Sequence, residues 1–297
     1  MADRPVLVFG RNGQLARELA RIAWPENLTP ICHGRNECDL SSGGTPRVSI
    51  ETVKPVFVVN AAAYTAVDRA ESESDAAFAL NRDAAGRVAE ACRHQGLPLV
   101  HVSTDYVFDG TKAGPYVEGD AIAPVSVYGT SKAAGEAAVR DAYDRHIILR
   151  TAWVYSPFGS NFVKTMLQLG CKHDRLRVVA DQRGSPTAAG DIARAIASLA
   201  AAILGGNERF GTYHYAGAGD VTRLDWATAI FAAGASHGRL QPRLEAARSV
   251  EFPTPARRPS NSALDCSRIG RDYAILPRPW RESVEDAVDE ILGGNGS

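Results

Sequence analysis

Short apolar runs, separated by polar segments, mark the first half of the chain. They lie at residues 6–9, 30–33, 56–60, 99–103 and 146–150. Each run is short and mostly apolar, a pattern typical of strands that are buried on both faces of a parallel sheet. The pattern therefore predicts a series of buried parallel strands before residue 151.

Helical patterns fill the segments between these runs. Residues 14–23, 74–94 and about 128–143 carry apolar side chains at helical spacing, and Gly96 is placed to end the second helix. Strands that alternate with helices imply an α/β fold, a doubly wound parallel sheet with right-handed crossovers. In such folds ligands bind at the carboxyl ends of the strands.

The pattern loosens after about residue 151, where the loops grow longer. Residues 176–179 and 213–215 are further strand candidates, and an alanine-rich segment at 187–204 predicts a helix. The segment 252–261 is rich in proline and arginine and is not expected to form a regular element. A chain of 297 residues suits one large α/β domain, or a larger domain with a smaller lobe.

A glycine turn follows the first apolar run. Gly10 allows a tight turn, and Gly13 allows a pyrophosphate to approach the backbone N–H groups at the start of the next helix. Ala16 stands at the third position of the glycine pattern and still permits close packing of helix and strand. Strand, turn and helix give the context of a dinucleotide fingerprint, although an ordinary turn between strand and helix has the same outline.

The end of the second strand bears on the choice of nicotinamide cofactor. No acidic residue ends the run at 30–33, so the usual acceptor for the 2′-hydroxyl of NAD is missing. Arg35 follows instead and could pair with a 2′-phosphate, although it also fits an ordinary surface arginine. NADPH is therefore favoured mildly over NADH.

Composition argues against several classes of function. The net charge of −1 gives no electrostatic basis for binding nucleic acid or a membrane surface. The five cysteines are scattered and form no Cys-x-x-Cys pair, which indicates a reducing compartment and argues against zinc. No run approaches the roughly 20 apolar residues of a membrane span, and the first apolar run is too short for a signal peptide. We therefore expect a cytoplasmic protein.

Tyr128 and Lys132 form the most informative pair of side chains. Their spacing of four places both on one face of a helix. An ammonium beside a phenol favours the phenolate and is expected to lower the pKa of the tyrosine, which gives a proton donor and acceptor usable near neutral pH. Taken alone, the spacing also fits a solvated lysine beside a half-buried tyrosine.

Two strand ends complete this constellation. Residues 60–65 bring small side chains to the end of the third strand, where a cofactor could lie against the backbone. Residues 103–105 place hydroxyl groups at the end of the fourth strand, where one could donate a hydrogen bond to a substrate carbonyl. Tight packing and strand capping are the alternative interpretations. With Tyr128 and Lys132, these ends suit hydride transfer from a bound nicotinamide to a ketone.

Taken together, the motifs resemble the extended short-chain dehydrogenase/reductase superfamily and, within it, the dTDP-4-dehydrorhamnose reductase family. The matching strings follow one another from about residue 6 to residue 262, and their order is far more specific than any one string. They are Phe9-Gly10-x-x-Gly13-Gln14, residues 60–68 with Ala70-Glu71, residues 103–110, Val127-Tyr128-Gly129-x-Ser131-Lys132-x-x-Gly135-Glu136, Arg150-Thr151-x-Trp153-Val154-Tyr155, Asn161-Phe162, Asp181-Gln182-x-Gly184-x-Pro186-Thr187 and Arg258-Pro259-x-Asn261-Ser262.

The resemblance implies a reaction and a role for each matching residue. It implies that NADPH or NADH reduces the C4 keto group of dTDP-4-dehydro-L-rhamnose, with Tyr128, Lys132 and Thr104 as the catalytic residues and Tyr128 as proton donor. The implied cofactor contacts are Gly10, Asn12, Gly13, Gln14, Leu15, Arg35, Asp39, Leu40, Ala62, Ala63, Tyr64, Thr65, Tyr128 and Lys132. The implied substrate contacts are Thr65, Val67, Thr104, Asp105, Trp153, Asn161, Arg258 and Asn261.

Pattern and resemblance together predict two parts of the chain. Residues 1–150 are expected to form a Rossmann-type domain that binds NAD(P). Residues 151–297 are expected to form mostly a smaller α/β lobe that binds the substrate, with about 176–204 returning to the Rossmann-type domain. A dTDP-sugar is the only expected partner besides the cofactor and a possible second copy of the chain.

Two alternatives stay open at this point. A fold of this kind can also serve as a non-catalytic, nucleotide-binding regulatory subunit, because fold alone does not prove catalysis. The enzyme could also reduce another nucleotide 4-keto-6-deoxysugar. Dehydration is disfavoured, because Tyr106 stands where the related 4,6-dehydratases carry a glutamate.

Some members of the family dimerise through a metal ion that three glutamates hold. Glu18 and Glu290 could match two of these, but Gly190 stands at the third position and its side chain has no ligand atom. We therefore expect no metal site, and either a monomer or a homodimer.

Overall fold

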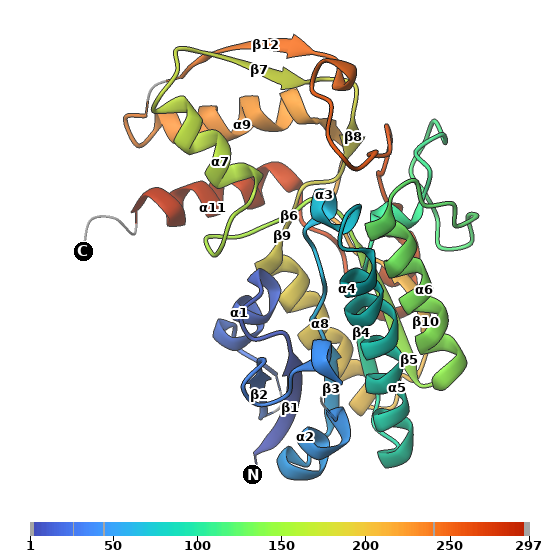
Figure 1. Cartoon of the computed structure of the whole chain (residues 1–297). Coiled ribbons are helices and arrows are strands. Elements are labelled where there is room, and N and C mark those ends of the chain that lie inside the picture. The colour runs from blue at the N-terminus through green and yellow to red at the C-terminus, as the bar shows by residue number, and fades with distance from the viewer. Residues whose placement is uncertain (1–2, 26, 44, 240, 294–297) are drawn as a thin grey trace.

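A parallel sheet of six strands forms the centre of the computed structural model, which describes residues 3–25, 27–43, 45–239 and 241–293 (Figure 1). Its strand order is β10-β5-β4-β3-β1-β2, and every neighbouring pair is parallel. The chain order reverses between β1 and β3, so the ligand crevice of the fold is expected there. The strands are β1 (Arg4–Phe9), β2 (Leu28–His33), β3 (Phe57–Asn60), β4 (Leu99–Thr104), β5 (His146–Thr151) and β10 (Gly211–His214).

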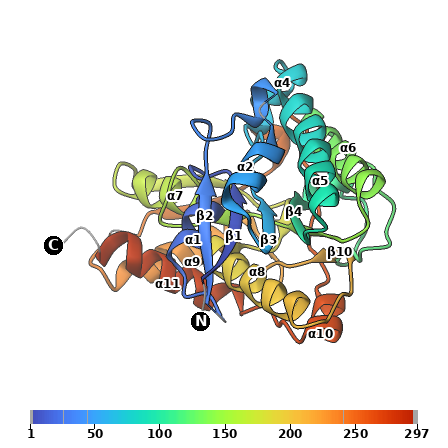
Figure 2. The same ribbon diagram turned by 90° about the horizontal axis from the view of Figure 1, so that it is seen from below.

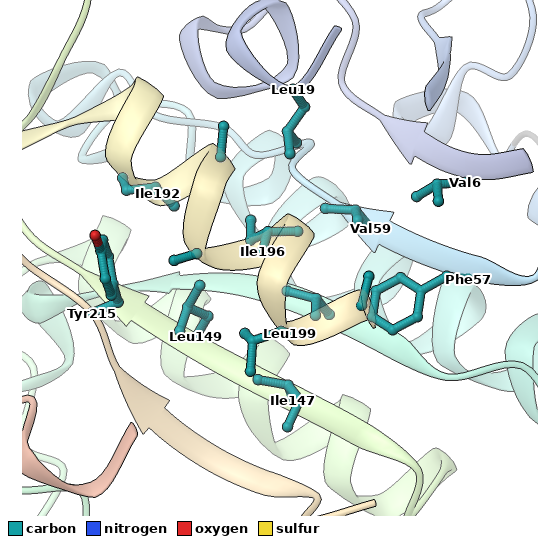
Figure 3. Packing of buried hydrophobic residues seen from close by; sticks show 14 of the residues in the cluster. Val6, Leu19, Phe57, Val59, Ile147, Leu149, Ile192, Ile196, Leu199 and Tyr215 are labelled. Atoms are coloured by element: carbon teal, nitrogen blue, oxygen red, sulfur yellow. The ribbon is translucent and has the colours of Figure 1, made fainter. Parts of the chain in front are cut away.

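Helices cover both faces of this sheet (Figure 2). Val59, Ile147 and Ile196 belong to the core on one face (Figure 3), whereas Val58 and Ile148, the chain neighbours of the first two, belong to the core of the other face. This alternation is why the strands are apolar almost throughout. The helices on the first face are α1 (Gln14–Arg21), α8 (Ala189–Leu204) and α10 (Ser267–Tyr273), and those on the second are α2 (Pro46–Val53), α5 (Ala84–Gln95) and α6 (Val127–Ala142). The doubly wound α/β fold predicted from the sequence is confirmed.

A second core lies beyond the carboxyl ends of the strands, in the upper part of Figure 1. Three helices pack there beside three pairs of short strands, of which only the β8–β11 pair is antiparallel. The helices are α7 (Phe162–Gly170), α9 (Arg223–Ala235) and α11 (Trp280–Gly293). The strand pairs are β6 (Val154–Tyr155) with β9 (Thr187–Ala188), β7 (Arg175–Val179) with β12 (Arg243–Ala247), and β8 (Arg183–Gly184) with β11 (Val221–Thr222).

The two predicted strands after residue 151 go to different sheets. The run at 176–179 lies in β7 and pairs with β12, whereas the run at 213–215 overlaps β10 and adds to the central sheet. Helix α8 begins at Ala189 because the two residues before it form β9. The division into two domains at residue 150 stays a prediction.

The helix predicted at 74–94 is interrupted. It is built from α4 (Ser74–Phe78), a π-helical turn at Ala79–Asp83 and α5, and Gly96 ends it at φ +65° as expected. The sequence pattern does not reveal the interruption, because one extra residue shifts the apolar spacing only slightly. Within residues 252–261 the only regular pairing is an isolated bridge at Asn261, as the prolines predict. In the described part of the chain, no helix has the length and apolar character needed to cross a membrane.

Candidate active site

Two adjoining cavities lie where the strand order reverses, at the carboxyl ends of the central strands. Gly13, Ala61 and Ala63 line both of them. The smaller has a volume of about 180 Å³ and the larger about 430 Å³. A glycine turn shared by two cavities suits a ligand that extends from one into the other.

The smaller cavity collects the residues predicted to hold the far end of a dinucleotide. Gly10 has φ +104°, and a Cβ atom there would lie 2.8 Å from the backbone nitrogen of Ala62, so no larger residue fits this turn. Gly10 therefore lets the turn pack directly on the segment after β3, beside the cavity. The predicted cofactor residues that line it are Gly10, Asn12, Gly13, Arg35, Asp39, Leu40, Ala62 and Ala63.

The larger cavity brings together the predicted chemistry. The predicted residues that line it are Gln14, Leu15, Thr65, Val67, Thr104, Asp105, Tyr128, Lys132 and Trp153. They come from the first turn of α1, from the carboxyl ends of β3, β4 and β5 with the segments that follow, and from helix α6, although the sequence separates the first from the last by more than a hundred residues.

Tyr128 lies in the first turn of α6, where the Ser126 side chain caps the helix by accepting a hydrogen bond from Gly129 N at 3.2 Å. The tyrosine is 8% exposed, and the edge of its ring meets Tyr106 at 5.6 Å between centroids. Burial raises the pKa of Tyr128, and the Thr104 hydroxyl opposes this rise only in part. A phenol in this setting is protonated at neutral pH, as a proton donor must be.

The expected lowering of the Tyr128 pKa by Lys132 is therefore wrong for this structure. Lys132 is 1% exposed, and its ammonium donates to the backbone oxygen of Val102 at 2.7 Å. Burial lowers the pKa of Lys132 to about 8, although Glu136 favours the charged form. The spacing of four residues predicts that both side chains lie on one face of the helix. It carries no information on how deeply they are buried, and burial is the main cause of both pKa shifts.

Thr104 and Asp105 form a short polar chain at the end of β4. The Thr104 hydroxyl donates to Asp105 Oδ1 at 2.9 Å and accepts from Tyr106 N at 3.2 Å. Asp105 Oδ2 is buried and has no hydrogen-bond partner among the described residues. Burial raises the pKa of Asp105 to about 6, although the nearby hydroxyl groups of Ser262 and Thr104 oppose the rise. The Oδ2 atom therefore lacks a hydrogen-bond donor, and a bound ligand can supply one.

Trp153 forms one wall of the larger cavity in a strained conformation. Its φ is +44°, in the left-handed region that side chains other than glycine rarely adopt. The indole stacks on Trp226 at 5.5 Å between centroids, and a Cβ atom at Gly184 would lie 2.4 Å from it. Gly184 therefore leaves room for the indole ring, and the left-handed backbone conformation of Trp153 accompanies the position of the ring at the cavity wall.

Two buried networks hold α6 and the neighbouring loop in place. Asn81, in the π-helical turn, accepts from Tyr64 N at 2.8 Å and donates to Tyr64 O at 3.1 Å and to Ser131 Oγ at 2.9 Å. A Cβ atom at Gly135 would lie 2.0 Å from the Asn81 carbonyl oxygen, so α6 packs directly on this turn. Asn81 is a positioning residue that sequence reasoning missed.

The second network centres on Glu136, which is fully buried. It accepts from Arg150 at 2.8 and 2.7 Å, from Ser103 at 2.6 Å and from Arg140 at 2.6 Å. Burial alone would raise the pKa of Glu136, but the hydrogen bonds and charge of Arg150 outweigh it and lower the pKa. The network ties α6 to β4 and β5.

Four predicted site residues line neither cavity within the described part of the chain, and their roles stay predictions. Tyr64 donates its hydroxyl to Glu73 at 2.5 Å. The other three, Asn161, Arg258 and Asn261, also have protein partners. Asn161 Nδ2 donates to Gln14 Oε1 at 2.9 Å, Arg258 pairs with Asp68 at 2.8 Å, and Asn261 Nδ2 donates to the carbonyl oxygens of Lys112 and Gly114 at 2.8 and 3.0 Å.

Arg223 is a charged residue lining the larger cavity that sequence reasoning missed. It is the first residue of α9 and faces the larger cavity together with Tyr106, Phe162 and Trp226. One signal was present in the sequence. A cation in the first turn of a helix interacts unfavourably with the helix dipole. An arginine at that position therefore suggests a role other than stabilising the helix.

The residues around Glu18 do not fit a metal ion. Arg21 places its guanidinium between Glu18 and Glu290, donating to Glu18 at 2.5 and 3.1 Å and to both oxygens of Glu290. Glu18, Arg21, Gly190 and Glu290 line a third cavity, away from the two described above, and the side chain of Gly190 offers no ligand atom. No group of three or more His, Cys, Asp or Glu is placed to hold a metal in the ranges that the structure describes. A cation from the chain itself satisfies the two glutamates.

We therefore expect that divalent metal ions do not change the oligomeric state. Arg21 already pairs with both carboxylates that a bridging ion would need. Sedimentation velocity with about 5 mM Mg²⁺, several times a weak dissociation constant of roughly 1 mM, and with excess EDTA should give the same sedimentation coefficient. A dimer that forms only with magnesium would contradict this expectation.

Comparison with known proteins agrees with the site. The family model described as RmlD substrate binding domain matches residues 4–292. A dTDP-4-dehydrorhamnose reductase of Sinorhizobium fredii is 44% identical over 287 residues, which cover 96% of this chain and 97% of that protein. Another, from Aggregatibacter actinomycetemcomitans, is 39% identical over 285 residues, which cover 95% and 97%.

A solved structure gives the same result for the fold. The dTDP-4-dehydrorhamnose reductase of Bacillus anthracis, in complex with NADP, superposes with a TM-score of 0.89 at 33% identity and covers 97% of this chain and 100% of that one. The resemblance drawn from the motifs is therefore confirmed, and the chain belongs to the dTDP-4-dehydrorhamnose reductase family.

Proposed function

We propose that this protein is an oxidoreductase that reduces the C4 keto group of dTDP-4-dehydro-L-rhamnose to dTDP-L-rhamnose, with NADPH as the preferred cofactor. A bound nicotinamide supplies the hydride. The observation that carries the proposal is the meeting of Tyr128, Lys132 and Thr104 in one cavity that shares the glycine turn with a second. A relative of the same family is solved with NADP bound, which supports the cofactor.

The three side chains divide the proton chemistry. Tyr128, kept protonated by burial, donates its phenolic proton to the C4 oxygen as negative charge develops there. Thr104 lies beside the phenol and stabilises the phenolate that remains, since its hydroxyl opposes the rise in the tyrosine pKa. Lys132, held by the Val102 carbonyl, is placed to bind the nicotinamide ribose.

The remaining predicted residues orient the substrate and the cofactor. Asp105 has a free carboxyl oxygen for a sugar hydroxyl, and the Trp153 ring provides an apolar wall for the sugar. Asn161, Arg258 and Asn261 remain proposed substrate contacts on the strength of the family motifs. We also propose a two-domain division at residue 150, a cytoplasmic location, no nucleic-acid partner, and either a monomer or a homodimer.

The direct test is oxidation of NADPH, followed by absorbance, with dTDP-4-dehydro-L-rhamnose made in situ by the upstream enzymes. NADPH consumption with formation of dTDP-L-rhamnose is the expected result. No consumption, with nucleotide binding intact by calorimetry, would favour a non-catalytic regulatory subunit. Consumption with another nucleotide 4-keto-6-deoxysugar only would move the assignment to that substrate.

Arg35→Ala should raise the KM for NADPH by about tenfold and leave the KM for NADH within about twofold. Arg35 lines the smaller cavity, and a charged hydrogen bond to a 2′-phosphate is worth roughly that factor. Arg11, which lines the same cavity, is already paired with Glu37 at 2.7 Å. Steady-state kinetics with both cofactors measures the effect. Equal changes for both cofactors would assign Arg35 no part in the preference.

A further inference from the structure

Arg223 lies in the larger cavity on a platform of three aromatic rings. Its guanidinium carbon is 3.6 Å from the centroid of the Trp153 ring, 5.3 Å from that of Phe162 and 5.4 Å from that of Trp226. The rings themselves stack, with Phe162 and Trp226 4.6 Å apart. Stacking holds a guanidinium by its face and leaves the N–H groups at its edge free to donate.

This guanidinium has no counter-charge within hydrogen-bond distance. It makes no hydrogen bond and no ion pair with any residue that the structure describes. The other buried or partly buried arginines at this end of the sheet differ, since Arg150 pairs with Glu136 at 2.7 Å and Arg258 with Asp68 at 2.8 Å. Burial lowers the pKa of Arg223 to about 10, so the side chain is still charged at neutral pH. The guanidinium therefore has no directly paired anion, and the Asp105 carboxyl in the same cavity acts on it only at longer range.

The position of Arg223 in its helix points to the same need for an anion. It is the first residue of α9, whose N-terminus carries the positive end of the helix dipole. The Thr222–Asp225 capping box already stabilises this end, so the arginine is not needed there for the helix. Trp226, one turn later, also lines the cavity, and its indole N–H is buried without a partner among the described residues. Donors and positive charge thus converge on one place.

We infer that Arg223 binds the diphosphate of the nucleotide-sugar substrate. The inference rests on the proposed function, because it names the residue that holds the anionic part of that substrate. A diphosphate is the one anionic group between the sugar and the nucleoside, and Thr104 and Asp105, which are proposed to contact the sugar, line the same cavity. Arg258, which the resemblance implies as a substrate contact, is already paired with Asp68 and is therefore less available to a diphosphate.

The test measures the binding of thymidine, dTMP and dTDP by calorimetry, in the presence of saturating NADP⁺. Three proteins are compared: the wild type, Arg223→Met and Arg281→Met. Arg281 is the matched control, because it also stacks on a tryptophan, with its guanidinium carbon 4.9 Å from the Trp280 ring, but lies outside both cavities. In Arg223→Met the Kd for dTDP should rise about 10- to 100-fold, while the Kd for thymidine stays within about twofold. Arg281→Met should bind all three like the wild type.

Turnover separates binding from chemistry. Arg223→Met should raise the KM for the keto-sugar substrate with a kcat within about threefold of the wild type, because the diphosphate is remote from C4. The KM of Arg223→Lys should lie between those of the wild type and Arg223→Met, because lysine keeps the positive charge but loses the planar guanidinium that stacks on the rings. An unchanged Kd for dTDP in Arg223→Met, or an equal loss for thymidine and dTDP, would overturn the inference. If the wild type itself neither binds dTDP nor reduces the keto-sugar, the proposed function fails instead.

Discussion

Replacing Tyr128 with phenylalanine should lower kcat by about 10²–10⁴-fold at neutral pH, because the variant removes the proximal proton donor to the C4 oxygen. The structure supports this size of effect, since Tyr128 is buried in the cavity, protonated and in contact with the Thr104 hydroxyl. Loss of the phenol leaves the fold and the nucleotide cavities in place. The measurement is kcat under saturating substrate and NADPH, with NADP⁺ affinity measured by calorimetry on the same preparation.

Tyr143→Phe is the matched control. Tyr143 is also largely buried and follows the last residue of the same helix, α6, but it lies far from the cavities. Its variant should keep kcat within about twofold. A Tyr128→Phe protein that turns over at nearly the wild-type rate, with normal folding and NADP⁺ binding, would remove Tyr128 from the role of proton donor.

Glu136→Ala should lower the free energy of unfolding by about 3–5 kcal/mol at neutral pH, because it leaves the buried Arg150 guanidinium without a counter-charge. Glu136 is fully buried and Arg150 is 1% exposed. The pKa of Glu136 is lower in the folded protein than in the unfolded chain. Its contribution is therefore complete above the unfolded pKa of about 4.3 and is lost as the pH falls through the lower folded pKa. Urea denaturation at pH 7 and at pH 4 and below should show the difference between variant and wild type shrinking with acid.

Two further variants test the cause. Glu51→Ala removes a carboxylate from an exposed pair with Arg47, four residues away on α2, and should cost no more than about 0.5 kcal/mol. The double variant Glu136→Met with Arg150→Met removes both buried charges and should be more stable than Glu136→Ala alone. A Glu136→Ala protein within 1 kcal/mol of the wild type, an outcome well below the range expected for a broken buried pair, would show that the network contributes little.

The central sheet could be predicted because each strand carries its own signal. Strands buried on both faces are apolar along their whole length, and the runs at 6–9, 99–103 and 146–150 fall inside β1, β4 and β5. Which sheet a strand joins is a different matter. The short run in β7 has the composition of a central strand but pairs with β12, and only contacts far apart in the sequence decide that.

The sequence predicted which residues form the site better than it predicted their pKa values. Tyr128, Lys132 and Thr104 meet as the motifs imply, since the ends of parallel strands come together. The direction of the Tyr128 pKa was wrong, because spacing along a helix carries no information on burial. Arg223 was missed for a related reason: the rings beside it come from the segment after β5, from α7 and from α9, which no local pattern connects.

The π-helical turn at Ala79–Asp83 restricts how this chain can change in length during evolution. Such a turn holds one residue more than the α-helix it interrupts. Deleting one residue there would restore a continuous helix and rotate the preceding part by about 100° relative to α5. Asn81 would then no longer face both the Tyr64 backbone and Ser131. Substitutions on the exposed side of this helix can accumulate, whereas a single-residue deletion would detach the loop after β3 from the helix that carries the catalytic pair.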